Sequence, residues 1–249
     1  MQVHFLFLLP TAFLLPPGTW AGEIIGGKEA ELHSRPYMAY LLIKKDNKNS
    51  YCGGFLVAEN FVLTAAHCQG ELLQVPPLCH SPAPSDLTLL QVPPHPIPHP
   101  QYGLLPISMS QKGWSLRPCE KQNKFVKTIA LPEANVGVES ETVCSVAGWG
   151  RTIANDSSSG ANALREVDVE VLEDDECSKY AKSDPATMLC AGHPEKCRDS
   201  AKGDSGGPLV CDGKAQGIVS RASEEGTPPN VYTRVSAFLS WIQDEMGRL

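Results

Sequence analysis

From Tyr37 onward, the apolar residues of this chain come in short runs, and turn residues separate one run from the next. The clearest run is Val167-Asp168-Val169-Glu170-Val171, whose alternation of apolar and acidic residues is typical of a half-buried antiparallel strand. We expect further strands at residues 37–43, 55–57, 61–65, 143–147, 209–211, 215–220 and 231–235. Many short strands predict an all-β protein built as a sandwich or as barrels.

The last segment of the chain is an exception, because its apolar residues recur at helical spacing. Ser236 is a suitable N-cap ahead of them. We expect a helix over about 236–247 with one apolar face, formed by Phe238, Leu239, Ile242 and Met246. Elsewhere the 21 prolines disfavour a helical bundle, because proline lacks the backbone N–H that a helix interior needs.

The first 21 residues are apolar, but three prolines interrupt them before they reach the ~20 residues of a membrane-spanning helix. Thr19 and Ala21 have the spacing of small residues that signal peptidase accepts. We interpret 1–21 as a secretory signal peptide; the alternative, a buried N-terminal strand, has no amphipathic pattern to support it. Secretion places the nine cysteines in an oxidising compartment, where disulfides persist.

Charge and hydropathy exclude two classes of partner. The formal net charge is −7, whereas a surface that binds nucleic acid is basic. No stretch after residue 21 is long and apolar enough to span a bilayer. We therefore predict neither a nucleic-acid partner nor a membrane partner.

One stretch departs from the strand pattern, because ten of the prolines lie between Pro76 and Pro106. Proline removes a donor from the hydrogen-bond ladder, so central strands are not expected there. The composition predicts an extended loop, although a loop of this length is uncommon inside a compact domain.

Three local motifs carry residues suited to nucleophilic chemistry. They are Thr64-Ala65-Ala66-His67-Cys68, Gly203-Asp204-Ser205-Gly206-Gly207-Pro208 and Ile24-Ile25-Gly26-Gly27. A serine hydroxyl is a poor nucleophile unless a base takes its proton, and histidine is the base whose pKa suits neutral pH. Glycines beside the serine also leave backbone N–H groups free to face a developing oxyanion.

With Ala147-Gly148-Trp149-Gly150 and the Trp241-Ile242 segment, these motifs resemble those of a chymotrypsin-fold serine protease. Residues 22–27, 33–40, 52–55 and 217–220 are similar to the granzyme, mast-cell chymase and cathepsin G subgroup. The resemblance covers residues 22–68 and about 123–249.

This resemblance implies two six-stranded antiparallel Greek-key barrels followed by a C-terminal α-helix, with the active site between the barrels. The implied protease domain is 24–247. Within it the N-terminal barrel covers about 24–128, the C-terminal barrel about 129–235 and the helix about 236–247.

The resemblance also implies the catalytic roles. His67 is the general base and Ser205 the nucleophile, and the amides of Gly203 and Ser205 form the oxyanion hole. Residues 22–23 form an activation dipeptide that a dipeptidyl peptidase removes. The freed Ile24 amino group then pairs with Asp204 and orders the oxyanion hole.

Six cysteines have partners by the same resemblance, namely Cys52–Cys68, Cys144–Cys211 and Cys177–Cys190. Cys79, Cys119 and Cys197 are left over. Asn155-Asp156-Ser157 is an acceptor motif for N-glycosylation, and we expect Asn155 to carry a glycan.

The resemblance stops between residues 69 and 122, where the family has the aspartate that orients the histidine. Asp86, in Ser85-Asp86-Leu87-Thr88-Leu89-Leu90, imitates that strand but lies only 19 residues after His67. Counting from Tyr102 at the family spacing leads instead to Ser110, which is not acidic. Two alternatives therefore stay open, that Asp86 orients His67 or that no acid does. A misspliced or out-of-frame segment would also have a nearly normal length and an unfamiliar sequence.

The same segment contains His80, His95 and His99 near Cys79, but their spacing matches no closed zinc site. We therefore predict neither a metal nor a cofactor.

In this fold the residue six before the nucleophile lies at the base of the substrate pocket, and here it is Asp199. A buried carboxylate there favours Arg or Lys substrates, whereas a solvated loop aspartate would have no such role. Ala222 and Asn230, near Ser220, replace family glycines and narrow the pocket.

The chain is therefore predicted to be a secreted or granule-stored serine endopeptidase that hydrolyses peptide bonds through an acyl-enzyme. Expected partners are protein or peptide substrates, an activating dipeptidyl peptidase and serpin inhibitors. The alternative is a catalytically impaired relative that acts as a binding or antimicrobial protein, or a misspliced isoform. Such relatives are usually basic and usually lack one of the two catalytic residues, whereas this chain is acidic and has both His67 and Ser205.

Overall fold

The computed structural model describes residues 24, 27–45, 48–59, 61–68, 71–74, 96–98, 107–111, 126–134, 136–150, 163–178, 184–192, 200, 203–221 and 229–247. The predicted signal peptide and activation dipeptide lie outside these residues. So do Asp86, Asn155, Asp199, Ala222 and the three cysteines without a predicted partner. Among the helices that are described, none is long and apolar enough to cross a membrane.

One half of the molecule is a closed antiparallel barrel. Its sheet has the strand order β1-β9-β10-β13-β12-β11-β8, and β8 also pairs with β9, which closes six of the strands on themselves. The strands are β1 (Lys28–Glu29), β8 (Val143–Gly148), β9 (Arg165–Val171), β10 (Met188–Gly192), β11 (Pro208–Cys211), β12 (Lys214–Arg221) and β13 (Asn230–Arg234).

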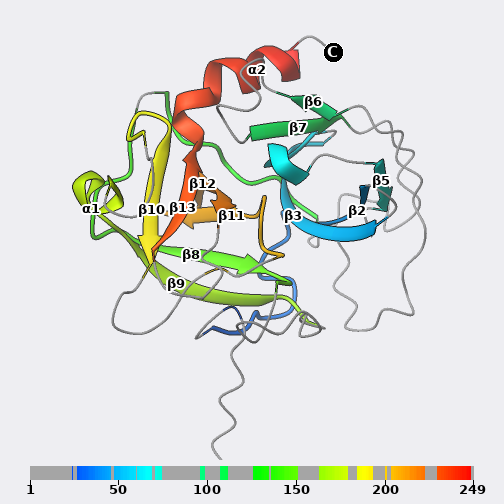
Figure 1. Ribbon diagram of the computed structural model, residues 1–249, viewed down its shortest axis with the longest axis horizontal. Coiled ribbons are helices and arrows are strands. Elements are labelled where there is room, and N and C mark those ends of the chain that lie inside the picture. Colours follow the sequence, from blue (N-terminus) through cyan, green and yellow to red (C-terminus); the bar gives the residue numbers. More distant parts are fainter. Residues whose placement is uncertain are drawn as a thin grey trace, which may run out of the picture.

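The other half is a six-stranded antiparallel sheet with the order β5-β2-β3-β4-β7-β6. Its strands are β2 (Met38–Lys45), β3 (Lys48–Ala58), β4 (Phe61–Ala65), β5 (Glu71–Gln74), β6 (Pro96–Pro98) and β7 (Ile107–Gln111). Of the proline-rich segment, the structure describes 96–98, which form the short strand β6 at an edge of the sheet, where a missing N–H costs least. Figure 1 shows the closed barrel and this sheet on opposite sides of the molecule, with α2 (Leu239–Gly247) at the top.

The alternation in β9 has the predicted consequence. Val167, Val169 and Val171 are buried in the core of the closed barrel, whereas Asp168 is exposed. β4 is instead buried along its whole length, because side chains on both of its faces, such as Val62 and Leu63, pack into the hydrophobic core. The all-β prediction with a C-terminal helix is therefore confirmed.

The helices differ in detail from the prediction. The terminal α-helix begins at Leu239, three residues later than expected, and a 3₁₀ helix over Val235–Phe238 precedes it. Ser236 is therefore not the N-cap; it is buried inside the 3₁₀ turn. A short helix, α1 (Asp174–Ser178), was not predicted, because one buried residue in five gives no helical period.

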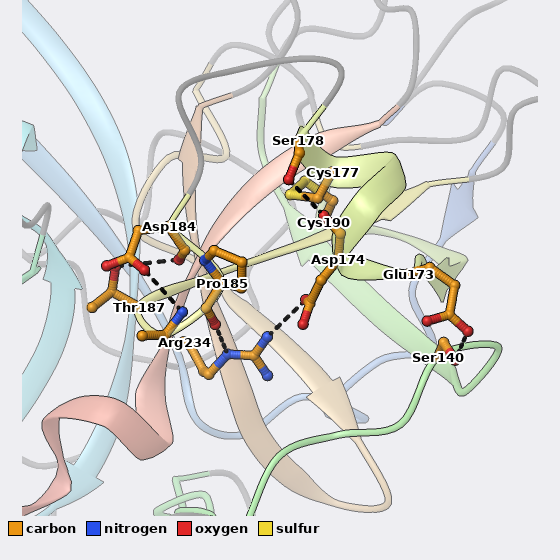
Figure 2. Close-up of polar contacts among 11 residues, drawn as sticks. Ser140, Glu173, Asp174, Cys177, Ser178, Asp184, Pro185, Thr187, Cys190 and Arg234 are labelled. Atoms are coloured by element: carbon orange, nitrogen blue, oxygen red, sulfur yellow. Dashed lines mark hydrogen bonds and ion pairs between the residues drawn. A yellow bond between two sulfur atoms is a disulfide. The ribbon is translucent and has the colours of Figure 1, made fainter.

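All three predicted disulfides are present, Cys52–Cys68, Cys144–Cys211 and Cys177–Cys190. The last of them fastens α1 to β10, as Figure 2 shows. In the same view, Arg234 of β13 donates from Nε to the Pro185 carbonyl at 3.0 Å and from Nη2 to Asp174 Oδ1 at 3.4 Å. This corner of the barrel is therefore held covalently and by charged hydrogen bonds.

Arg35 connects the segment before β2 to the closed barrel. Its Nε donates to Glu166 Oε2 at 3.1 Å, and its Nη1 donates to Ser145 Oγ at 2.9 Å and to the Tyr37 hydroxyl at 3.1 Å. Burial opposes the charge of Arg35, but the hydrogen bonds and charges of Tyr37 and Glu166 outweigh it and raise its pKa. The two halves of the molecule are thus joined by a cation that stays charged.

Candidate active site

His67 lies in a single 3₁₀ turn, Ala66–Cys68, at the end of β4. The turn is fixed from both sides, because Ala66 is buried and Cys68 is bonded to Cys52 of β3. His67 itself is exposed. The fold thus presents an imidazole to solvent from a rigid backbone, which suits a general base.

The turn that carries Ser205 docks on the two strands that hold His67. The Ser205 carbonyl accepts a hydrogen bond from Gly53 N of β3 at 2.8 Å, and Thr64 Oγ1 of β4 donates to the Gly53 carbonyl at 2.8 Å. Gly206 has φ +86°, and a Cβ on it would overlap both Thr64 and Gly53. A glycine is required there, and it allows the serine turn to approach the first sheet this closely.

Asp204 is fully buried beside the glycines that follow β8. Gly150 N donates to Asp204 Oδ1 at 2.7 Å, and a Cβ on either Gly148 or Gly150 would overlap the carboxylate. This close approach explains the Ala147-Gly148-Trp149-Gly150 motif, because any side chain at either glycine would displace the buried charge. Ile24 is also buried, at 1% exposure, in the core of the same barrel.

Gly203, the predicted oxyanion-hole residue, has φ +110°, a backbone conformation that L-residues rarely adopt. Two further bonds hold the turn that follows it, from Gly206 N to the Val219 carbonyl at 2.8 Å and from Gly207 N to the Asp204 carbonyl at 2.9 Å. The turn that carries Ser205 is therefore held by backbone hydrogen bonds to β12 and within the turn itself.

The predicted pocket is represented by Ser220 and Asn230 among the described residues. Asn230 is buried, and its Nδ2 donates to the Ser200 carbonyl at 2.7 Å and to Ser200 Oγ at 2.6 Å. Ser200, which is also buried, follows Asp199 in the chain. Sequence reasoning missed Ser200, and its position between Asp199 and the nucleophile was the one signal for it.

A scan of family models matches the model described as trypsin to residues 24–242 of this chain. The chain belongs to the trypsin family of serine proteases. The match includes the turns of His67 and Ser205 and begins at Ile24, the residue predicted to become the new amino terminus.

Relatives of this trypsin-family chain cover nearly all of it. It is 48% identical to mast cell protease 3 of Ovis aries, with 97% of this chain and 96% of the relative aligned. It is 44% identical to cathepsin G of Homo sapiens, over 96% of this chain and 93% of that protein. It is 44% identical to granzyme B of Homo sapiens, over 97% of this chain and 98% of that protein.

Solved structures agree with the fold. One named as the structure of GrC superposes with a TM-score of 0.78 at 37% identity, over 89% of this chain and 99% of that one. Neuropsin, a serine protease of mouse brain, superposes with a TM-score of 0.75 at 31% identity, over 88% and 98%. The chymotrypsin-like fold that the motifs predicted is thereby confirmed.

The strand beside His67 differs from what a trypsin-family protease is expected to have there. β7 pairs with β4 in the register Ala65–Ile107 and Val62–Ser110, and it contacts the His67 turn. Its sequence, Ile-Ser-Met-Ser-Gln, contains no carboxylate. Ser110, the position reached by counting from Tyr102, lies in β7 opposite Val62 and carries no acid.

Among the described residues, one group has potential metal ligands close together, formed by Cys52, His67 and Cys68. The two cysteines are bonded to each other and offer no thiolate. The group therefore belongs to the disulfide that supports the histidine turn.

Proposed function

We propose that this chain is a secreted or granule-stored serine endopeptidase. The observation that carries the proposal is that the Ser205 turn is hydrogen-bonded to Gly53 of β3, whose neighbour Cys52 is covalently bonded to the turn of His67. A nucleophile and a base from distant parts of the chain thus share one support, as acyl transfer requires.

The chemistry follows from these residues. Ser205 Oγ attacks the carbonyl carbon of the peptide bond while His67 takes its proton. The amides of Gly203 and Ser205 stabilise the oxyanion, and His67 then gives the proton to the leaving amine. His67 then deprotonates a water molecule, which attacks the carbonyl carbon of the acyl-enzyme. The bond between this carbon and Ser205 Oγ breaks, His67 returns the proton to Oγ, and the acid product leaves.

We further propose activation by removal of Gly22-Glu23. The burial of both Ile24 and Asp204 supports this step, because a new ammonium at Ile24 could compensate a buried carboxylate only at short range. The domain bounds, 24–247 after a signal peptide at 1–21, follow from the same proposal. A dipeptidyl peptidase would be the activating partner, serpins would be inhibitors, and a glycan at Asn155 would mark passage through the secretory pathway.

One observation favours a second candidate, an impaired protease that acts mainly by binding. Because β7, the described strand that contacts the His67 turn, carries no carboxylate, we propose as this second candidate that His67 and Ser205 act as a dyad with a reduced rate, with Asp86 as the alternative acid. The loss of the orienting aspartate costs about 10⁴ in kcat in a well-studied triad protease, and the remaining groups still catalyse.

Labelling by a fluorophosphonate tests the main proposal. We expect the chain trimmed to Ile24 to label at Ser205, because the reagent captures only a serine whose hydroxyl is activated by a base. The Ser205→Ala and His67→Ala variants should not label, and the site is read by mass spectrometry. A folded, trimmed wild-type chain that stays unlabelled would leave the binding function as the better candidate.

For substrate choice, we propose cleavage after Arg or Lys, through Asp199 and Ser220, in a pocket that Asn230 and Ala222 narrow. The bonds from Asn230 to Ser200 support a shortened pocket, because they hold a side chain where the family has glycine. We expect such a pocket to bind arginine and lysine side chains less tightly than a deeper pocket with the same carboxylate at its base.

We expect Asn230→Gly to raise kcat/KM for an arginine anilide about tenfold relative to a phenylalanine anilide, because a few atoms in a pocket change selectivity by this order. Asn230→Ala keeps a Cβ and should give an intermediate ratio. The ratio is measured on trimmed protein with both substrates. A phenylalanine preference in the wild type that persists in the glycine variant would refute this specificity.

A further inference from the structure

The ring of Tyr51 lies against the Cα of Gly203. A Cβ built on Gly203 would overlap Tyr51 Cε2 and would come within 3.0 Å of Gly150 Cα. Gly203 is thus enclosed by an aromatic ring on one side and by backbone on the other. Gly203 has φ +110°, and a glycine can also adopt many other backbone conformations. The enclosure by Tyr51 and Gly150 favours the observed conformation over the others.

Tyr51 is supported by a second tyrosine on the neighbouring strand. The register of β2 and β3 pairs Tyr40 with Gly53, so that Tyr40 and Tyr51 are diagonal neighbours on one face. Their rings stack with centroids 5.7 Å apart and an interplanar angle of 15°. Burial and then the nearby Tyr51 phenol raise the pKa of Tyr40, so its hydroxyl stays neutral at physiological pH.

Trp149 connects the stacked tyrosines to the loop that contains Gly203 and Asp204. The Tyr40 ring meets Trp149 edge to face, with centroids 5.6 Å apart and an interplanar angle of 89°. Trp149 precedes Gly150, whose N–H donates to the aspartate that follows Gly203. The contacts therefore form a closed ring from Gly203 through Tyr51, Tyr40, Trp149 and Gly150, and movement of one member disturbs the others.

We propose that Tyr51 is a positioning residue for the oxyanion hole, and that its ring, braced by Tyr40 and Trp149, holds the Gly203 peptide in the orientation that binds the oxyanion. This inference rests on the proposed peptidase function. Tyr51 belongs to the six-stranded sheet and would support the Gly203 loop from that side. The buried Asp204 supports the same loop from the side of the closed barrel. Such preorganisation contributes to the transition state and little to substrate binding.

Kinetics of two variants test this role. We expect Tyr51→Ala to lower kcat about 10- to 100-fold while KM changes less than about threefold, because a displaced donor costs less than a deleted one. Tyr51→Phe keeps the ring and should retain kcat within about twofold of the wild type. Leu131→Ala, which truncates another half-buried side chain that packs against the core, is the control for a general loss of stability. A folded Tyr51→Ala enzyme with unchanged kcat would overturn the proposal.

Hydrogen exchange separates this proposal from the peptidase function. In a Ser205→Ala background, which needs no activity, we expect amides 203–207 to exchange about tenfold faster after Tyr51→Ala and at the original rate after Tyr51→Phe. Unchanged exchange in the alanine variant would overturn the positioning role. If the wild type hydrolyses nothing while exchange responds as expected, the peptidase proposal fails and the positioning of the loop by Tyr51 stands.

Discussion

Removal of Gly22-Glu23 is expected to raise hydrolysis about 10²- to 10³-fold, and Asp204→Asn is expected to abolish this gain. We expect this increase because the new Ile24 ammonium is proposed to pair with Asp204 and thereby order the Gly203 amide. One hydrogen-bond donor in an oxyanion hole contributes about 10²- to 10³-fold to kcat. Asparagine has the shape of aspartate and can still accept the hydrogen bond from Gly150 N, but it cannot pair with an ammonium.

The measurement compares hydrolysis of one peptide ester before and after trimming, in wild type and variant. Asp212→Asn, an exposed aspartate in the turn between β11 and β12, is the matched control and should be activated like the wild type. Thermal unfolding checks that Asp204→Asn is folded. A trimmed Asp204→Asn enzyme as active as the trimmed wild type would disprove the ion pair, and full activity before trimming would disprove the zymogen.

Replacement of Ser205 by alanine is expected to lower kcat of the trimmed enzyme only about 10²-fold. In a well-studied triad protease, removal of the serine costs about 2 × 10⁶ and removal of the aspartate alone about 3 × 10⁴. Under the dyad proposal, in which no aspartate orients His67, the chain has therefore already lost most of what its serine could contribute. The single and double variants of His67 and Ser205 should lose the same amount, because the two groups act as one unit.

Asp86→Asn distinguishes the dyad from a hidden triad. Under the dyad proposal its kcat stays within about twofold of the wild type, as should that of Asp168→Asn, an exposed aspartate on β9. If Asp86 orients His67, Asp86→Asn should instead cost about 10⁴, and Ser205→Ala about 10⁶. The segment before β7 would then complete the active site despite its unusual sequence.

Strands with an unambiguous pattern were predictable from the sequence. β4 has the predicted bounds, 61–65, and β8 and β9 extend by one or two residues beyond theirs. β10 was missed, because Met-Leu-Cys-Ala-Gly neither alternates nor contains a β-branched residue. The 3₁₀ turn before α2 was missed because apolar spacing does not separate it from the first turn of an α-helix.

The candidate site could be proposed from the sequence where its motifs are local, but not where its contacts depend on strand register. His67 and Ser205 are recognisable from their own neighbours. The bond between Asn230 and Ser200 joins residues 30 positions apart, and the enclosure of Gly203 by Tyr51 depends on how two sheets dock. The register of β7 on β4 likewise comes from strand pairing, which no local pattern in a proline-rich segment specifies.

The Cys52–Cys68 bridge makes the alignment of His67 and Ser205, the proposed catalytic pair, depend on the redox conditions around it. One sulfur belongs to the residue before Gly53, which binds the serine turn, and the other belongs to the residue after His67. Cleavage of this bond by a cellular thiol would free the His67 turn from β3, the strand to which the serine turn is hydrogen-bonded. In a reducing compartment, thiol exchange at this bridge would therefore lower the proposed activity by releasing the His67 turn.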